Sequence, residues 1–190
     1  MKIAISSRGS RGDIYPILQV GRHLQSLGHE VRACVPPLFK PRVRALGMEG
    51  LYYPEDSHEV MRSFGADWRA ARECLRWFSG GLIHQFRQLL SLTEGADVLL
   101  TSVNEVAGPT VAHHRGIPHF RMAYAPMLPG GQPPPLQPFQ RLPRLLNRAM
   151  WQGLNLSVAL LFSRRVNATR RRLGLRGVDN LADHLSETSH

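Results

Sequence analysis

The sequence contains few of the features that mark secreted or membrane-spanning proteins. Only two of the 190 residues are cysteines, Cys34 and Cys74, and they lack zinc-ligand spacing. Such a pair is more typical of buried thiols in a reducing compartment than of a disulfide. The longest apolar helical stretch, residues 154–162, is far shorter than the ~20 residues of a membrane span, and Met1 leads directly into a predicted strand without a secretory leader. We therefore expect a cytoplasmic protein.

Two common nucleotide-binding motifs are also missing. A Walker A loop ends in Gly-Lys-Ser/Thr, and the sequence contains no such tripeptide. A dinucleotide-binding motif needs Gly-x-Gly-x-x-Gly and an acidic residue at the end of the second strand. Here Gly9 and Gly12 are spaced Gly-x-x-Gly, and the second predicted strand ends in Val-Pro-Pro at residues 35–37. The Arg-Gly-Asp tripeptide at 11–13 resembles an adhesion motif, but three residues match by chance.

The composition is that of an ordinary globular domain, with 43% hydrophobic and 20% charged residues. Strand-like and helix-like patterns alternate, which predicts an α/β fold, a Rossmann-like open parallel sheet with helices on both faces. We expect a βαβ unit over residues 2–35 with its second strand at 31–35, further strands at 48–53, 98–101 and 119–124, and helices at 39–46, 68–93 (interrupted by glycines 80 and 81), 104–114 and 145–172.

Two segments are predicted to be loops. Residues 54–66 carry no clear periodicity, and residues 126–143 contain seven prolines. Because proline cannot continue a strand or helix, the second segment is expected to run over the carboxyl edge of the sheet, where open parallel sheets bind ligands. A polyproline recognition segment is the alternative interpretation.

The first predicted strand ends in a glycine-bracketed turn that carries Asp13. Gly9 and Gly12 permit positive φ and close approach of another molecule, and amides at a helix start can donate to an anion. A carboxylate at the mouth of such a loop is suited to proton abstraction. The alternative from the residue alone is that Asp13 only caps the following helix.

The run Gly-Ser-Arg-Gly-Asp at 9–13, Pro16, and Leu-Gly-His-Glu-Val at 27–31 resemble the N-terminal domain of GT-B glycosyltransferases. The sterol, antibiotic-aglycone and rhamnolipid glycosyltransferases are the most similar members. Weaker similarity continues through residues 95–101, 111–118 and 167–175. The resemblance implies that residues 1–190 form an acceptor-binding domain, one half of a GT-B fold, and that the nucleotide-sugar-binding C-terminal domain is absent from this chain.

The resemblance also implies roles for individual residues. Asp13 would be the general base of an inverting transfer from a nucleotide sugar to a hydroxyl of an apolar acceptor such as a lipid, sterol or natural-product aglycone. No metal or cofactor is expected. The loop Gly9, Ser10, Arg11 and Gly12 would face the donor diphosphate, and Tyr15, Asn104, Glu105, Tyr124, Met127, Leu128 and Phe139 would contact the acceptor. For Glu105, tuning Asp13 or capping a helix are further alternatives.

Two readings of the whole chain remain open. It is either part of a longer or two-chain glycosyltransferase, in which case the isolated chain is expected to be inactive, or a noncatalytic ligand-binding or partner-recruiting module. His113 and His114 are adjacent on a predicted helix and point to different faces, which argues against a shared metal.

Acidic residues are scarce: 14 Asp and Glu stand against 24 Lys and Arg, which gives a formal charge of +10, and Lys2 and Lys40 are the only lysines. Nucleic acid is not the expected partner, because no aromatic platform, helix-turn-helix or zinc-finger pattern accompanies the arginines. The donor diphosphate and anionic lipid headgroups fit better, with Arg170, Arg171 and Arg172 as candidates for peripheral membrane contact. A solvated basic face or a missing acidic partner domain would explain the charge equally well.

Overall fold

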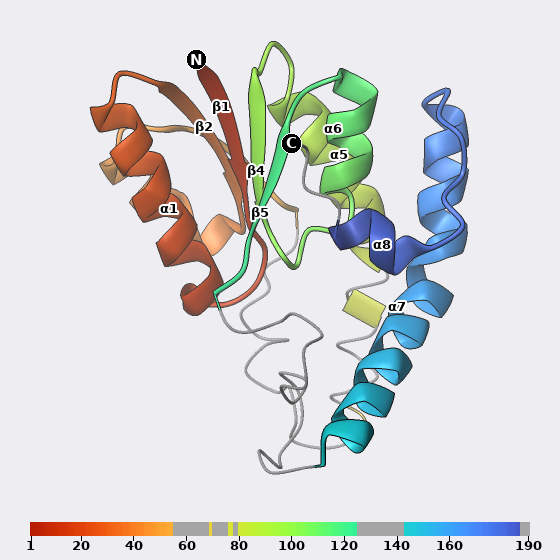
Figure 1. Ribbon diagram of the computed structural model, residues 1–190. Helices are drawn as coiled ribbons and strands as arrows, with labels where there is room; N and C mark the ends of the chain where they lie inside the picture. Colours follow the sequence, from red (N-terminus) through yellow and green to blue (C-terminus); the bar gives the residue numbers. More distant parts are fainter. Residues whose placement is uncertain (55–68, 70–75, 78–79, 125–142, 187–190) are drawn as a thin grey trace. The chain divides into compact units, whose positions relative to one another are not determined.

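The computed structural model describes residues 1–54, 69, 76–77, 80–124 and 143–186. The chain divides into two compact units, Met1–Met122 and Ala123–Glu187, each of which is described by itself. The first unit is an α/β unit that contains all the strands of the described residues (Figure 1). Its elements are β1 (Lys2–Ser6), α1 (Arg11–Ser26), β2 (Glu30–Val35), the short 3₁₀ turn η1 (Pro37–Phe39), α2 (Lys40–Ala45), β3 (Glu49–Tyr52), α5 (Leu82–Leu92), β4 (Val98–Ser102), α6 (Gly108–Arg115) and β5 (His119–Met122).

The five strands form one parallel sheet in the order β3-β2-β1-β4-β5. Helix α1 lies against one face of this sheet, and α5 and α6 lie against the other (Figure 1). The fold predicted from the sequence, a Rossmann-like parallel sheet covered on both faces, is confirmed. The strand order reverses between β1 and β4, which is where open α/β sheets place their ligands.

The sequences of the strands are nearly continuous runs of apolar residues because both faces of the sheet are buried. Ala4 and Ile5 on β1 and Ala33 and Val35 on β2 are fully buried, as expected for strands covered on both faces. Helix α1 approaches this layer closely at Gly21, where an added Cβ would lie 2.6 Å from Cδ1 of Ile5. The βαβ unit of residues 2–35 is therefore confirmed in both its elements and its packing.

Several element boundaries differ from those predicted. The helix expected at 104–114 begins only at Gly108, with Pro109 at its start, because proline lacks an amide hydrogen and suits the first helical turn. The fifth strand ends at Met122 instead of residue 124. Most of the predicted loop 54–66, the first part of the helical region 68–93 and all but the last residue of the proline-rich loop 126–143 lie outside the described residues, as does Cys74. Cys34 is buried and does not form a disulfide.

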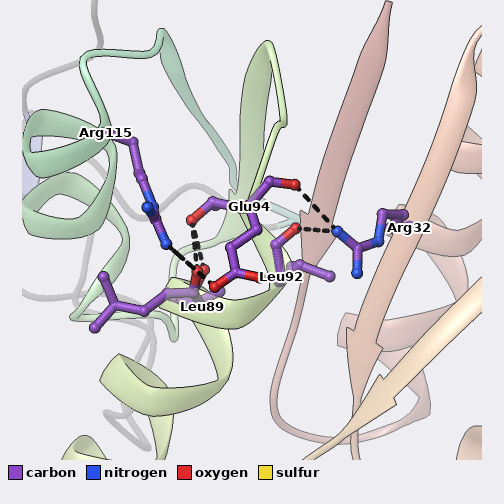
Figure 2. Close-up of polar contacts among 7 residues, drawn as sticks. Arg32, Leu89, Leu92, Glu94 and Arg115 are labelled. Carbon is purple, nitrogen blue, oxygen red and sulfur yellow. Dashed lines mark hydrogen bonds and ion pairs between the residues drawn. The ribbon is translucent and has the colours of Figure 1, made fainter.

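Two arginines cap the end of α5 (Figure 2). Arg115 from α6 donates to the carbonyl of Leu90 at 2.7 Å, and Arg32 from β2 donates to the carbonyls of Leu92 and Glu94, both at 3.3 Å. These groups satisfy carbonyls that have no partner within the helix and place positive charge at its C-terminus. Arg32 also pairs with Glu49 at 3.0 Å and Arg115 with Glu94 at 3.9 Å, so both arginines serve the fold and leave the excess of positive charge to other arginines.

The second unit contains α7 (Arg144–Arg172) and α8 (Leu181–Ser186). The long helix predicted at 145–172 is confirmed, but Arg170 is not available for the membrane contact predicted for it. Arg170 is buried; its Nε donates to the carbonyl of Arg176 at 2.7 Å, and its Nη1 lies 3.4 Å from Nε2 of His184. Arg171 and Arg172 are exposed. Among the described helices, none has the length and apolar character needed to cross a membrane.

Candidate functional site

Asp13 and Asn104 meet where the strand order reverses. Asp13 lies in the first turn of α1, which follows β1, and Asn104 lies in the loop that follows β4. The Asn104 side-chain amide donates to Oδ1 of Asp13 at 3.2 Å and to the carbonyl of Arg8 at 3.0 Å. Both side chains therefore lie at the carboxyl edge of the sheet. Asn104 fixes the orientation of the Asp13 carboxylate.

Ser10 holds the other carboxylate oxygen. Its backbone amide and its Oγ hydroxyl donate to Oδ2 of Asp13 at 2.8 and 2.9 Å. The alternative that Asp13 is the N-cap is therefore wrong in its detail: Ser10 is the N-cap, and Asp13, at the third helical position, accepts from the cap amide as in a capping box. A carboxylate accepts about four hydrogen bonds, and the described residues supply three to Asp13. The half-buried Asp13 therefore retains capacity to accept a proton from a bound hydroxyl.

The two glycines of the turn have different roles. Gly9 has a φ of +129°, and an added Cβ would overlap the Asp13 carboxylate and lie 3.1 Å from Nδ2 of Asn104. Gly12 lies within α1 and is not among the glycines with positive φ, so only Gly9 uses the positive φ that both glycines permit. Ser10, Arg11 and Gly12 are exposed, whereas Gly9 is buried beneath the carboxylate.

The expected acceptor contacts are distributed unevenly. Tyr15 is 45% exposed on α1, and its ring meets that of Phe39 edge-to-face with centroids 5.9 Å apart. Tyr124 belongs to the second unit, and its position relative to Asp13 is not defined. Three further expected contacts lie outside the described residues: Met127, Leu128 and Phe139.

Glu105 is placed differently from Asn104. It is fully buried, and its Oε1 accepts from Oγ of Ser6 at 3.1 Å and from the hydroxyl of Tyr53 at 3.0 Å. Its side chain therefore points into the protein, so it presents no surface to an acceptor in this conformation. A helix-capping role is wrong, because the N-cap of α6 is Ala107. Burial raises the pKa of Glu105 to about 7, although Arg8 and the two hydroxyl donors oppose the increase.

Sequence reasoning missed two residues that support this site. The buried guanidinium of Arg8 lies over the rings of Trp77 and Tyr53, with Cζ 4.0 and 5.2 Å from their centroids. The buried Gln85 donates to the carbonyl of Asn104 at 3.3 Å and accepts from the amide of Ala107 at 3.2 Å. Gln85 has a detectable signal, since it lies one residue before Phe86 and three after Leu82 on the apolar face of a helix. Arg8 has none.

Metal ligands do not cluster in the described part of the chain. No group of three His, Cys, Asp or Glu side chains there is arranged to hold a metal ion. The expectation of a metal-independent reaction stays a prediction.

Comparison with known proteins shows what this chain is similar to. No protein-family model matches the chain. An uncharacterized glycosyltransferase of Mycobacterium leprae (strain TN) is 33% identical over 185 residues, which are 92% of this chain and 42% of that protein. The glycosyltransferase GtfE of Amycolatopsis orientalis is 27% identical over 191 aligned residues, 97% of this chain and 46% of that protein.

Solved structures show the same architecture. The glycotransferase of kitacinnamycin superimposes with a TM-score of 0.66 at 21% identity, over 97% of this chain and 43% of that one. The spinosyn rhamnosyltransferase SpnG, complexed with thymidine diphosphate, gives a TM-score of 0.53 at 18% identity, over 93% of this chain and 42% of that one.

The chain thus has the Rossmann-like α/β fold of one half of a GT-B protein. It is homologous to the glycosyltransferases, which confirms the resemblance found in the sequence. It spans less than half the length of the curated relatives that it matches, a share consistent with an N-terminal domain.

Proposed function

We propose that residues 1–190 are the acceptor-binding, catalytic-base half of an inverting glycosyltransferase. The observation that carries the proposal is the Asp13 carboxylate, which Asn104 and Ser10 hold where the strand order reverses and which retains a free acceptor site for the hydroxyl of a bound acceptor. The homology to glycosyltransferases supplies the reaction class. The second half of the protein would bind the nucleotide part of the donor.

The reaction proposed is a single displacement. Asp13 takes the proton from the acceptor hydroxyl as the oxygen forms its bond to the anomeric carbon of the sugar. The bond from that carbon to the diphosphate breaks, and the nucleoside diphosphate leaves with the electron pair. Attack from the opposite side inverts the configuration at the anomeric carbon. The exposed amides and side chains of Ser10 and Arg11, at the start of α1, would face the diphosphate.

The substrates are proposed by class. A thymidine diphosphate sugar is the first donor to test, because SpnG was solved with thymidine diphosphate. The acceptor is an apolar molecule with a free hydroxyl, as expected from the sequence, with the exposed Tyr15 ring as one contact. The alternative, a noncatalytic ligand-binding module, would retain the fold without needing the carboxylate of Asp13.

Titration calorimetry of residues 1–190 tests this division of labour. We expect weak binding of a hydroxylated apolar acceptor and negligible binding of thymidine diphosphate sugars, because the nucleotide contacts are assigned to the other half. The longer protein, with both halves, should bind the sugar nucleotide and transfer the sugar. Tight sugar-nucleotide binding by residues 1–190 alone would contradict the assignment, and a longer protein that binds both substrates without transfer would favour the noncatalytic module.

Peripheral membrane contact is a further partner proposal for α7. Residues 144–172 contain seven arginines and no acidic residue, and each basic residue near an anionic surface contributes about 1 kcal/mol. We expect salt-sensitive sedimentation with phosphatidylserine vesicles, weakened up to about 100-fold when the exposed Arg164, Arg171 and Arg172 are changed together to Gln. Arg170 is left intact because it is buried.

The matched control removes the same charge from the other unit. Arg22, Arg42 and Arg44 are exposed on α1 and α2, so changing these three to Gln lowers the net charge equally without touching α7. Equal weakening by both triple variants would mean that net charge alone attracts the vesicles. No binding by the wild-type protein would remove the membrane from the list of partners.

A further inference from the structure

Arg8 occupies a closely fitted buried position directly after β1. Its side chain is 1% exposed, and its guanidinium lies against the rings of Trp77 and Tyr53. Gly81 closes a further side: an added Cβ there would lie 2.8 Å from Cζ of Arg8 and closer still to its terminal nitrogens. Because two rings and a backbone confine the guanidinium, it has little room to move.

Glu105, in the loop after β4, contacts the same buried group of side chains that surrounds Arg8. Its Oε1 accepts hydrogen bonds from the hydroxyls of Ser6 and Tyr53, and the ring of the same Tyr53 lies against the Arg8 guanidinium. Oε2 has no hydrogen-bond partner among the described residues. Arg8 follows β1 and Glu105 follows β4, so Tyr53, which contacts both residues, links the two loops that also carry Asp13 and Asn104.

Both residues are linked to the Asp13 carboxylate through Asn104. The carbonyl of Arg8 accepts from the Asn104 side-chain amide, which in turn donates to Asp13. Glu105 is the next residue after Asn104, and Gln85 holds the carbonyl of Asn104 and the amide of Ala107 on either side of it. A shift of Arg8 or of Glu105 would therefore move the group that orients Asp13.

We propose that the buried Arg8 and Glu105, which contact the ring and the hydroxyl of Tyr53, together position Asp13 through Asn104, and that they do so fully only when Glu105 is ionised. This inference rests on the proposed function, because it assigns a consequence to the position of Asp13. Neither residue touches a substrate; both are positioning residues.

The titratable and charged groups that face Glu105 in the described part of the chain are Arg8, Tyr53 from the end of β3, and Cys34 on β2. Burial raises the pKa of Cys34 and of Tyr53, so both stay neutral at physiological pH. The carboxyl group of Glu105 is therefore the member of this cluster that changes charge between pH 5 and pH 8.

The pH dependence of activity and of stability should then run in opposite directions. Burial raises the pKa of Glu105 from 4.5 to about 7, so the folded protein holds this proton more tightly than the unfolded chain does. That stabilisation is complete below pH 4.5 and is lost as the pH rises to about 7. The turnover number should instead rise over the same interval as Glu105 becomes ionised.

The test is a pH profile of kcat, KM and melting temperature for the longer protein and its Glu105→Gln variant. In Glu105→Gln we expect kcat to fall about 10- to 100-fold, because Asp13 is misplaced, with both KM values changed by less than about two-fold. In this variant, kcat should no longer rise with pH near pH 7, and the melting temperature should no longer fall over the same pH interval. A variant with wild-type kcat and an unaltered profile would overturn the proposal.

A second pair of variants tests the position of Arg8 without changing any charge. Gly81→Ala would push against the Arg8 guanidinium, whereas Gly80→Ala meets nothing within 4 Å. We expect kcat to fall about 10-fold or more in Gly81→Ala and to stay at the wild-type value in Gly80→Ala. Equal activity of the two variants would overturn the proposal even if Glu105→Gln failed to fold. If Asp13→Asn keeps wild-type turnover, the proposed function fails instead, whatever Glu105 does.

Discussion

Asp13→Asn, made in the protein with both halves, should lower the rate of sugar transfer by about 10²–10⁴-fold while the fold persists, because removal of a general base typically costs this much. Asparagine can still accept from the amide of Ser10, so the start of α1 should remain capped. The measurement is kcat together with the melting temperature. A loss of turnover without a loss of melting temperature separates the proposed base from a structural cap.

A second substitution controls for the local hydrogen bonds. In Asp13→Asn the new amide group would face a donor, either Ser10 or Asn104. Adding Asn104→Asp restores a donor-acceptor pair between the two positions but leaves no carboxylate at position 13. Recovery of turnover in this exchanged variant, but not in Asn104→Asp alone, would mean that the pairing limits the reaction; recovery in both would mean that the carboxylate at position 104 can act as the base. We expect no recovery.

The sequence predicted Asp13 and Asn104 as parts of one site but not their contact, and the topology explains why they meet. Parallel strands end at the same edge, so residues that follow β1 and β4 are neighbours once the sheet order is right. The same argument placed Glu105 beside them, and there it was insufficient. Consecutive loop residues point in different directions, and no period tells which one turns inward; the buried hydroxyls of Ser6 and Tyr53 determine that Glu105 does.

The burial of two arginines, Arg170 and Arg8, was not predicted from the sequence, and only one of them could have been predicted to be buried. Arg170 follows Phe162 and Val166 at intervals of four residues on α7, and both are buried, so helical periodicity indicates a buried position that a simple count of basic residues hides. Arg8 follows a strand and precedes a glycine. Its burial depends on Tyr53, Trp77 and Gly81, which are distant in the sequence.

Gly9→Ala should be among the most damaging small substitutions in the described part of the chain. Alanine at a φ of +129° is strained, and its Cβ would lie 2.8 Å from Cγ of Asp13 and closer still to Oδ2. We expect a loss of about 2–4 kcal/mol of stability, which corresponds to roughly 5–15 °C in melting temperature. Transfer should fall by about 10²-fold even where the protein is folded, because the carboxylate is displaced.

Two other glycines separate the causes of this effect. Gly28 also has a positive φ, +86°, but an added Cβ meets nothing within 4 Å, so Gly28→Ala carries the backbone strain alone. Gly12→Ala carries neither cost, since Gly12 is helical and its Cβ would meet only Oγ of Ser10 at 3.5 Å. We expect Gly28→Ala to lose about 1 kcal/mol of stability with normal turnover, and Gly12→Ala to melt at or slightly above the wild-type temperature. If Gly9→Ala resembled Gly28→Ala in both melting temperature and turnover, the close packing of Gly9 against Asp13 would have no part in holding the carboxylate.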